Sequence, residues 1–88
     1  MEIVLDFSKI SNKDEMFELI KSQLNNEEFY GNNLDALYDV LSYEKQDVKF
    51  VISNIKNLEQ EFKLYIKKFI LVVEDVEQIN NNVKITIL

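Results

Sequence analysis

The sequence predicts an α/β domain in which a three-stranded parallel sheet packs against three or four helices. Three short segments rich in valine, isoleucine and leucine are separated by stretches whose apolar residues follow helical spacing. Strands separated by helical connections pair in parallel. The chain has 88 residues, no proline and one glycine, so we expect a single domain over residues 1–88, made of long elements and short turns.

The first strand is predicted over Glu2–Phe7, with both faces buried as in a covered parallel sheet. A polar connection follows, in which Ser11 or Asn12 can cap the next helix. That helix is amphipathic and ends near Asn25. Its apolar face is formed by Phe17, Ile20 and Leu24.

The middle of the chain is predicted to be a loop, a helix and a strand. The loop covers Glu27–Asn32, and the helix runs from about Asn33 to Ser42. Asp47–Ile52 has the apolar content of the second strand.

The last part of the chain is predicted to be helical and then extended. Asn54 can cap a helix, and apolar spacing continues over Ile55–Ile79 as one helix or as two with a break near Glu59–Lys63. The run Asn80–Asn82 is a stop signal, and Val83–Leu88 is predicted to be the third strand.

Charge and residue inventory exclude several function classes. The net charge is −6 and no lysine occurs from Ser22 to Glu44, so the surface there repels nucleic acid and attracts a basic partner. The chain has no cysteine, no histidine and no Gly-rich phosphate loop. We therefore expect that it is not an enzyme and that it has no cofactor or metal site. We also expect a cytoplasmic chain without a membrane segment, monomeric when free.

The helix from Leu34 has an inner and an outer side. Leu34, Leu37 and Leu41 share one face. Asp35 and Asp39 lie roughly 150° from it, at about 100° per residue. Like charges at i, i+4 disfavour their own helix by roughly a few tenths of a kcal/mol, so an exposed pair of this kind indicates a binding role.

Three aromatic residues lie near these carboxylates, as is typical of interface hot spots: Phe29, Tyr30 and Tyr38. Each of them can instead serve in packing. We expect Tyr30 to be structural and Tyr38 to be exposed, while Phe29 can cover the sheet edge or the first helix.

The run FYGNNLDALYDVL, from Phe29 to Leu41, resembles the signature of the barstar family, the intracellular inhibitors of barnase-type ribonucleases. Its specific core is Tyr30–Leu37, and the order of elements agrees along nearly the whole chain. The resemblance implies a barstar-like fold and an antitoxin or immunity role. It also implies a basic ribonuclease as partner, whose active site is plugged by the acidic helix and its preceding loop.

By the same resemblance, Asp39 takes the place of the substrate phosphate and Asp35 adds a second acidic contact. A further acid on the last helix corresponds to Glu77, with Asp75 as the alternative. The implied contact residues are Phe29, Gly31, Asn33, Leu34, Asp35, Tyr38, Asp39 and Glu77.

The chain also departs from the family's pattern. Phe29 replaces a tyrosine, Tyr38 replaces a tryptophan, and the Gly-Trp pair that follows this helix in the family is absent from Ser42–Glu44. The alternative function is therefore a barstar-fold interaction module with a non-nuclease partner.

Overall fold

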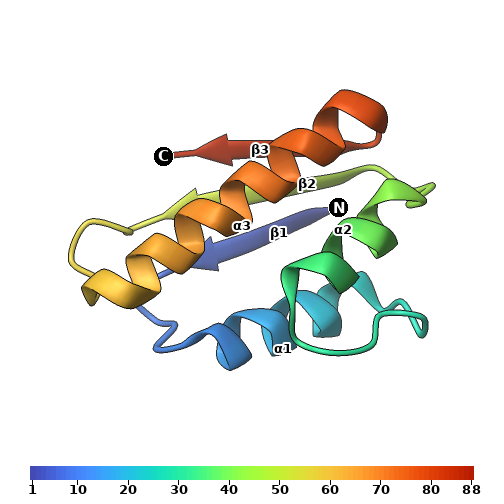
Figure 1. The fold of residues 1–88 in the computed structure, drawn as a ribbon. Helices are drawn as coiled ribbons and strands as arrows, with labels where there is room; N and C mark the ends of the chain where they lie inside the picture. Colours follow the sequence, from blue (N-terminus) through green and yellow to red (C-terminus); the bar gives the residue numbers. More distant parts are fainter.

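Three parallel strands and three helices make up the computed structural model, which describes all residues 1–88 (Figure 1). The elements are β1 (Glu2–Asp6), α1 (Lys13–Leu24), α2 (Leu34–Ser42), β2 (Val48–Ser53), α3 (Gln60–Ile79) and β3 (Val83–Ile87). The strands form one sheet in the order β1-β2-β3, with both pairs parallel. The predicted α/β architecture is confirmed. None of the three helices has both the length and the apolar content needed to cross a membrane.

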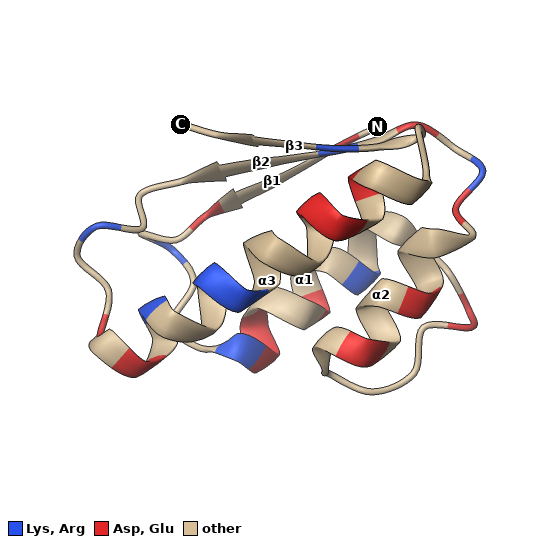
Figure 2. Cartoon of the chain, turned by 45° about the horizontal axis from the view of Figure 1, so that its top comes forward, with Lys and Arg blue, Asp and Glu red and all other residues tan.

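All three helices lie on one face of the sheet (Figures 1 and 2). Ile3 pairs with Phe50 on this covered face, and both side chains are fully buried. Val4 pairs with Val51 on the other face, where Val4 is 50% exposed. The prediction that the first strand is buried on both faces is wrong, because no helix covers the second face and the strand alternates instead.

The hydrogen bonds at the start of α1 show which residue caps this helix. The Asn12 side chain accepts a hydrogen bond from the Glu15 N–H at 2.9 Å, and the Glu15 carboxylate accepts one from the Ser11 N–H at 2.7 Å. The first bond satisfies a backbone donor that the helix leaves free, and the second, a variant of the capping box, reaches back to the residue before the cap. Asn12 is therefore the cap, and Ser11 precedes it.

The region predicted to be helical from Ile55 is a loop up to Glu59, followed by the single helix α3. The Glu59 carboxylate caps this helix by accepting from the N–H groups of Glu61 and Phe62 at 3.0 and 3.1 Å. The predicted cap, Asn54, has φ +61° and donates instead to the Asp6 carboxylate at 2.8 Å. It therefore turns the chain and starts no helix.

The C-terminal ends of α2 and α3 are joined by the side chain of Asn80. Its amide nitrogen donates to the backbone oxygens of Leu41 at 2.8 Å and Glu44 at 2.9 Å. These carbonyl groups lie at and just beyond the end of α2, where the last turn of a helix has fewer intrahelical donors than acceptors. Asn80 therefore fixes where α2 ends relative to α3.

Replacing Asn80 by aspartate is expected to lower the free energy of unfolding by about 2–3 kcal/mol, because the carboxylate cannot donate to these carbonyl groups and is repelled by their oxygen atoms. Urea unfolding of the free chain measures this. The control is Asn81→Asp, which makes the same charge change at an exposed neighbour. Equal stability of the two variants would contradict the proposed role of the Asn80 amide.

Asp6 ends β1 and binds the turn that follows β2. Its carboxylate accepts hydrogen bonds from the Asn54 amide, the Ser8 hydroxyl at 2.7 Å and the Ser8 N–H at 3.0 Å. Those bonds, the one from Asn54 first, lower the pKa of Asp6 from 3.8 to about 2. The charged form is therefore held more strongly in the folded chain than in the unfolded one.

Stability is expected to fall as the pH decreases from about 4 to about 2, since the unfolded chain takes up the Asp6 proton first. Above this window the contribution of Asp6 is fully present. Urea unfolding at several pH values measures the slope. In Asp6→Asn the slope within this window should be shallower than in the native chain, and an unchanged slope would contradict the assignment.

Candidate functional site

The loop before α2 is anchored to α1 by Phe29. This ring is only 6% exposed and packs edge-on against Phe17, with 6.4 Å between the ring centroids. The Lys21 ammonium lies 5.2 Å from the Phe29 centroid and covers the ring from above. This burial agrees with the packing alternative in which Phe29 covers the first helix, and the ring holds the loop in place.

Gly31 and the two asparagines after it set the start of α2. Gly31 has φ +79°, and a Cβ at this position would lie 2.8 Å from the Asn33 amide nitrogen. Asn32 accepts from the Lys21 ammonium at 2.7 Å, which ties the turn to α1. The Asn33 side chain accepts from the Ala36 N–H at 2.8 Å, so it caps the N-terminus of α2.

The two sides of α2 differ as predicted. Leu37 and Leu41 are fully buried, whereas Leu34 at the first turn is half-buried. Asp35 and Asp39 are exposed on the outer side. The one ion pair within 4 Å in the structure joins Lys21 to Glu18, so neither aspartate of α2 has a cationic partner. Tyr38 is 40% exposed between the two sides, as expected.

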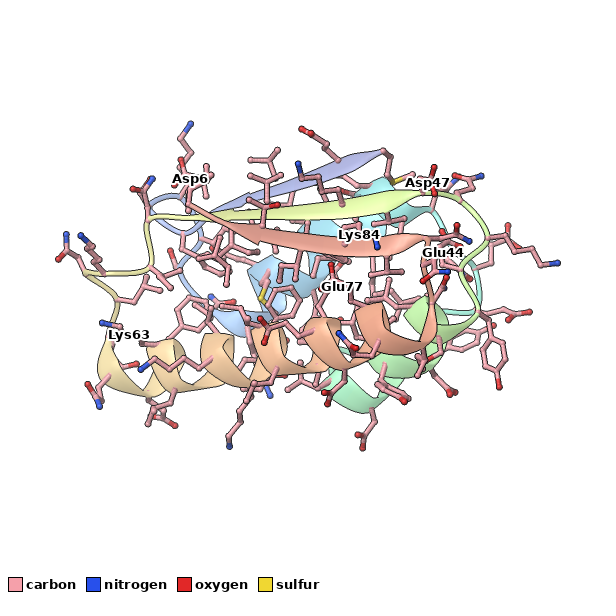
Figure 3. All side chains as sticks on the ribbon, turned by 90° about the horizontal axis from the view of Figure 1, so that it is seen from above. Asp6, Glu44, Asp47, Lys63, Glu77 and Lys84 are labelled. Carbon is pink, nitrogen blue, oxygen red and sulfur yellow. The ribbon has the colours of Figure 1, made fainter.

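The structure does not bring Glu77 together with the aspartates of α2. Glu77 is half-buried and points toward β3 (Figure 3). The opposite flank of α3 faces α1, because Tyr65 packs edge-on against Phe17 at 6.3 Å. Asp75 precedes Glu77 by two residues and lies roughly 160° from it around the helix axis. Asp75 is therefore on the outer side of α3, away from β3, and it is exposed.

Acidic residues lie along α2 and in the C-terminal half of α3 (Figure 2). Neither helix has a basic residue in its last turn, and the lysines of α3 lie in its N-terminal half. Asp39, in the last turn of α2, meets the negative end of the helix dipole at a cost of about 0.3–1 kcal/mol, whereas Asp35 lies in the first turn, where the dipole favours it. Asn80 brings these two ends together. We call the surface formed by Asp35, Asp39 and Asp75 the acidic face.

A cavity of about 440 Å³ lies beside the acidic face, between the loop and the second half of α2. It is lined by Asn26, Glu28, Tyr30, Ala36, Asp39, Val40 and Tyr43. Tyr30 is 77% exposed and Tyr43 is 80% exposed. The prediction that Tyr30 is structural is wrong, because Phe29 takes the inward position in this loop. Tyr43 was absent from the predicted contacts, although its spacing of four residues from Asp39 signals the same side.

The chemistry available at the acidic face is acceptance of hydrogen bonds from cations. No three acidic side chains anywhere in the chain are grouped closely enough to hold a metal ion. The exposed carboxylates are acceptors only, and they are strongest toward guanidinium and ammonium groups. The arrangement therefore fits recognition of a positively charged surface.

Comparison with known proteins gives one further finding. The family model described as "Barstar (barnase inhibitor)" matches residues 1–88, which is the whole chain. No curated protein matches the chain.

Proposed function

This chain belongs to the barstar family, and from that premise we propose that it is a cytoplasmic inhibitor of a basic, barnase-like ribonuclease. It acts by covering the active site of the enzyme with α2 and the loop before it. Members of this family are described as inhibitors and not as enzymes, and a protein partner of the ribonuclease type follows from that description.

The observation that carries the proposal is the acidic face at the joined ends of α2 and α3. Its carboxylates have no cationic partner in the free chain. Asp39 also lies in the last turn of α2, where the helix dipole disfavours a negative charge. An acidic side chain that destabilises its own helix and has no cationic partner within the chain indicates a partner on another molecule. A ribonuclease supplies it, because an enzyme that binds the RNA phosphate presents cationic side chains in its active site.

Each residue has a proposed role in that complex. Asp39 occupies the place of the substrate phosphate, and Asp35 binds a second cationic group. Gly31 lets the backbones approach closely, with Asn33 and Leu34 beside it, while Tyr38 covers the edge of the contact. For the last-helix acid, the geometry favours Asp75 over Glu77, because Asp75 shares the outer side with the aspartates of α2.

The test is inhibition of RNA cleavage by barnase and by any basic ribonuclease encoded next to this chain. The purified chain is added at increasing ratios to the enzyme, and loss of activity is expected to be complete at one inhibitor per enzyme. If a large excess of the folded chain leaves each of these enzymes fully active, the inhibitor proposal is wrong.

Salt is expected to slow formation of the complex. The acidic face and a basic enzyme attract one another over several ångströms, and ions screen this attraction. We expect the association rate constant to fall at least about tenfold between roughly 0.05 and 0.5 M NaCl. Stopped-flow fluorescence measures it, and the dissociation rate constant should change much less. An association rate constant independent of salt would exclude electrostatic steering.

A further inference from the structure

We propose that the cavity beside Asp39 receives an arginine side chain from the rim of the partner, held between Tyr30 and Tyr43. This inference rests on the proposed function, and it adds a contact beyond the cations expected at Asp39 itself. We call the cavity lined by Asn26, Glu28, Tyr30, Ala36, Asp39, Val40 and Tyr43 the tyrosine pocket.

The tyrosine pocket has an apolar base and aromatic walls. The base of the pocket is formed by Val40, which is nearly buried, and by Ala36, which is half-buried. Tyr30 belongs to the loop on one side, and Tyr43 caps the C-terminus of α2 on the other. Both tyrosines leave most of their surface to solvent, although large aromatic rings gain by being covered. The pocket therefore offers a site for a flat group that can lie against a ring.

The charge of the tyrosine pocket selects a cation. Glu28 and Asp39 contribute two carboxylates, and neither carboxylate takes part in the one ion pair of the structure. No lysine occurs between Ser22 and Glu44. An acidic side chain would be repelled, and a neutral one would leave both carboxylates uncompensated in a contact that excludes water.

Among cations, the tyrosine pocket fits arginine better than lysine. A guanidinium group is planar, so it can lie on a tyrosine ring while its N–H groups reach a carboxylate in pairs. An ammonium group is compact and strongly hydrated, and it gains less from a flat aromatic wall. Both features of the pocket, the rings and the carboxylates, are thus used at once only by arginine.

NMR titration of the free, labelled chain tests the pocket without any enzyme. The probe is the blocked tripeptide acetyl-Gly-Arg-Gly-amide, compared with the same peptide carrying lysine or uncharged citrulline. We expect saturable shifts of the Tyr30 and Tyr43 ring signals with arginine, at least fivefold weaker binding with lysine, and no binding with citrulline. Glu28→Gln should weaken arginine binding at least threefold, whereas Glu61→Gln, at the far end of α3, should leave it unchanged. Absent shifts at these rings, or equal binding of citrulline, would overturn the proposal.

The complex gives a second measurement. Tyr43→Leu, at a side chain that is 80% exposed, should keep the circular dichroism spectrum and raise the inhibition constant about tenfold. An unchanged inhibition constant would overturn the proposal. The two proposals fail separately: a chain that binds the arginine peptide but inhibits no ribonuclease removes the proposed function alone. A chain that inhibits while ignoring the peptide removes the tyrosine pocket alone.

Discussion

Changing Asp39 to alanine is expected to weaken inhibition of the ribonuclease at least 100-fold without destabilising the free chain. In the proposed complex this carboxylate is buried against cations, and removing one partner of a buried ion pair costs about 3–5 kcal/mol. At about 1.4 kcal/mol per tenfold, this corresponds to at least 100-fold in affinity. In the free chain Asp39 is exposed and unpaired, so its free energy of unfolding should stay within about 0.5 kcal/mol.

Inhibition constants and urea unfolding, measured on the same preparations, separate the two effects. Asp39→Asn keeps the shape and removes the charge, so it should lose nearly as much affinity as alanine. The pair Asp75→Ala and Glu77→Ala locates the last-helix contact, with about a tenfold loss expected for Asp75 and less than twofold for Glu77. Full potency of Asp39→Ala would remove this residue from the contact while leaving the function itself in place.

Changing Phe50 to alanine is expected to lower the free energy of unfolding by about 3–5 kcal/mol, as for other large aromatic residues in cores. Phe50 is fully buried on the central strand and packs edge-on against Phe69, with 5.8 Å between the ring centroids. The whole free energy of unfolding of a domain of this size is only about 5–15 kcal/mol. The melting temperature should therefore fall by at least about 12 °C, at about 4–8 °C per kcal/mol.

Calorimetry and urea unfolding measure this loss. The control is Val4→Ala on the uncovered face of the sheet, where half of the side chain is already in water. It should cost less than about 1 kcal/mol, because little apolar surface is buried there. Equal losses for the two variants would mean that the uncovered face is buried in solution.

The order of strands and helices was predictable, because apolar periodicity depends only on local spacing. The same spacing hid the start of α3, since Leu58, Phe62 and Ile66 continue one stripe across its boundary. That boundary is set by hydrogen bonds of the Glu59 side chain. Burial of β1 on both faces could not be judged from a short apolar run, because it depends on where helices pack.

For the candidate site, the loop before α2 and the outer side of α2 could be predicted from local sequence. The exchange of roles between Phe29 and Tyr30 did not, since adjacent loop residues have no periodicity that tells inside from outside. The choice between Glu77 and Asp75 depends on how α3 lies against β3, a contact that residue types alone do not fix. The tyrosine pocket lies between a loop and a helix end. Helical spacing indicates only the wall formed by Tyr43, because Tyr30 belongs to the loop.

The bare face of the sheet gives a practical means of handling the molecule. It lies on the side away from the three helices, and the natural sequence has no cysteine. Val4→Cys would therefore create a single thiol for attaching biotin or a dye. A sensor chip loaded through that thiol would hold every molecule in the same orientation, with the acidic face directed into the flowing solution.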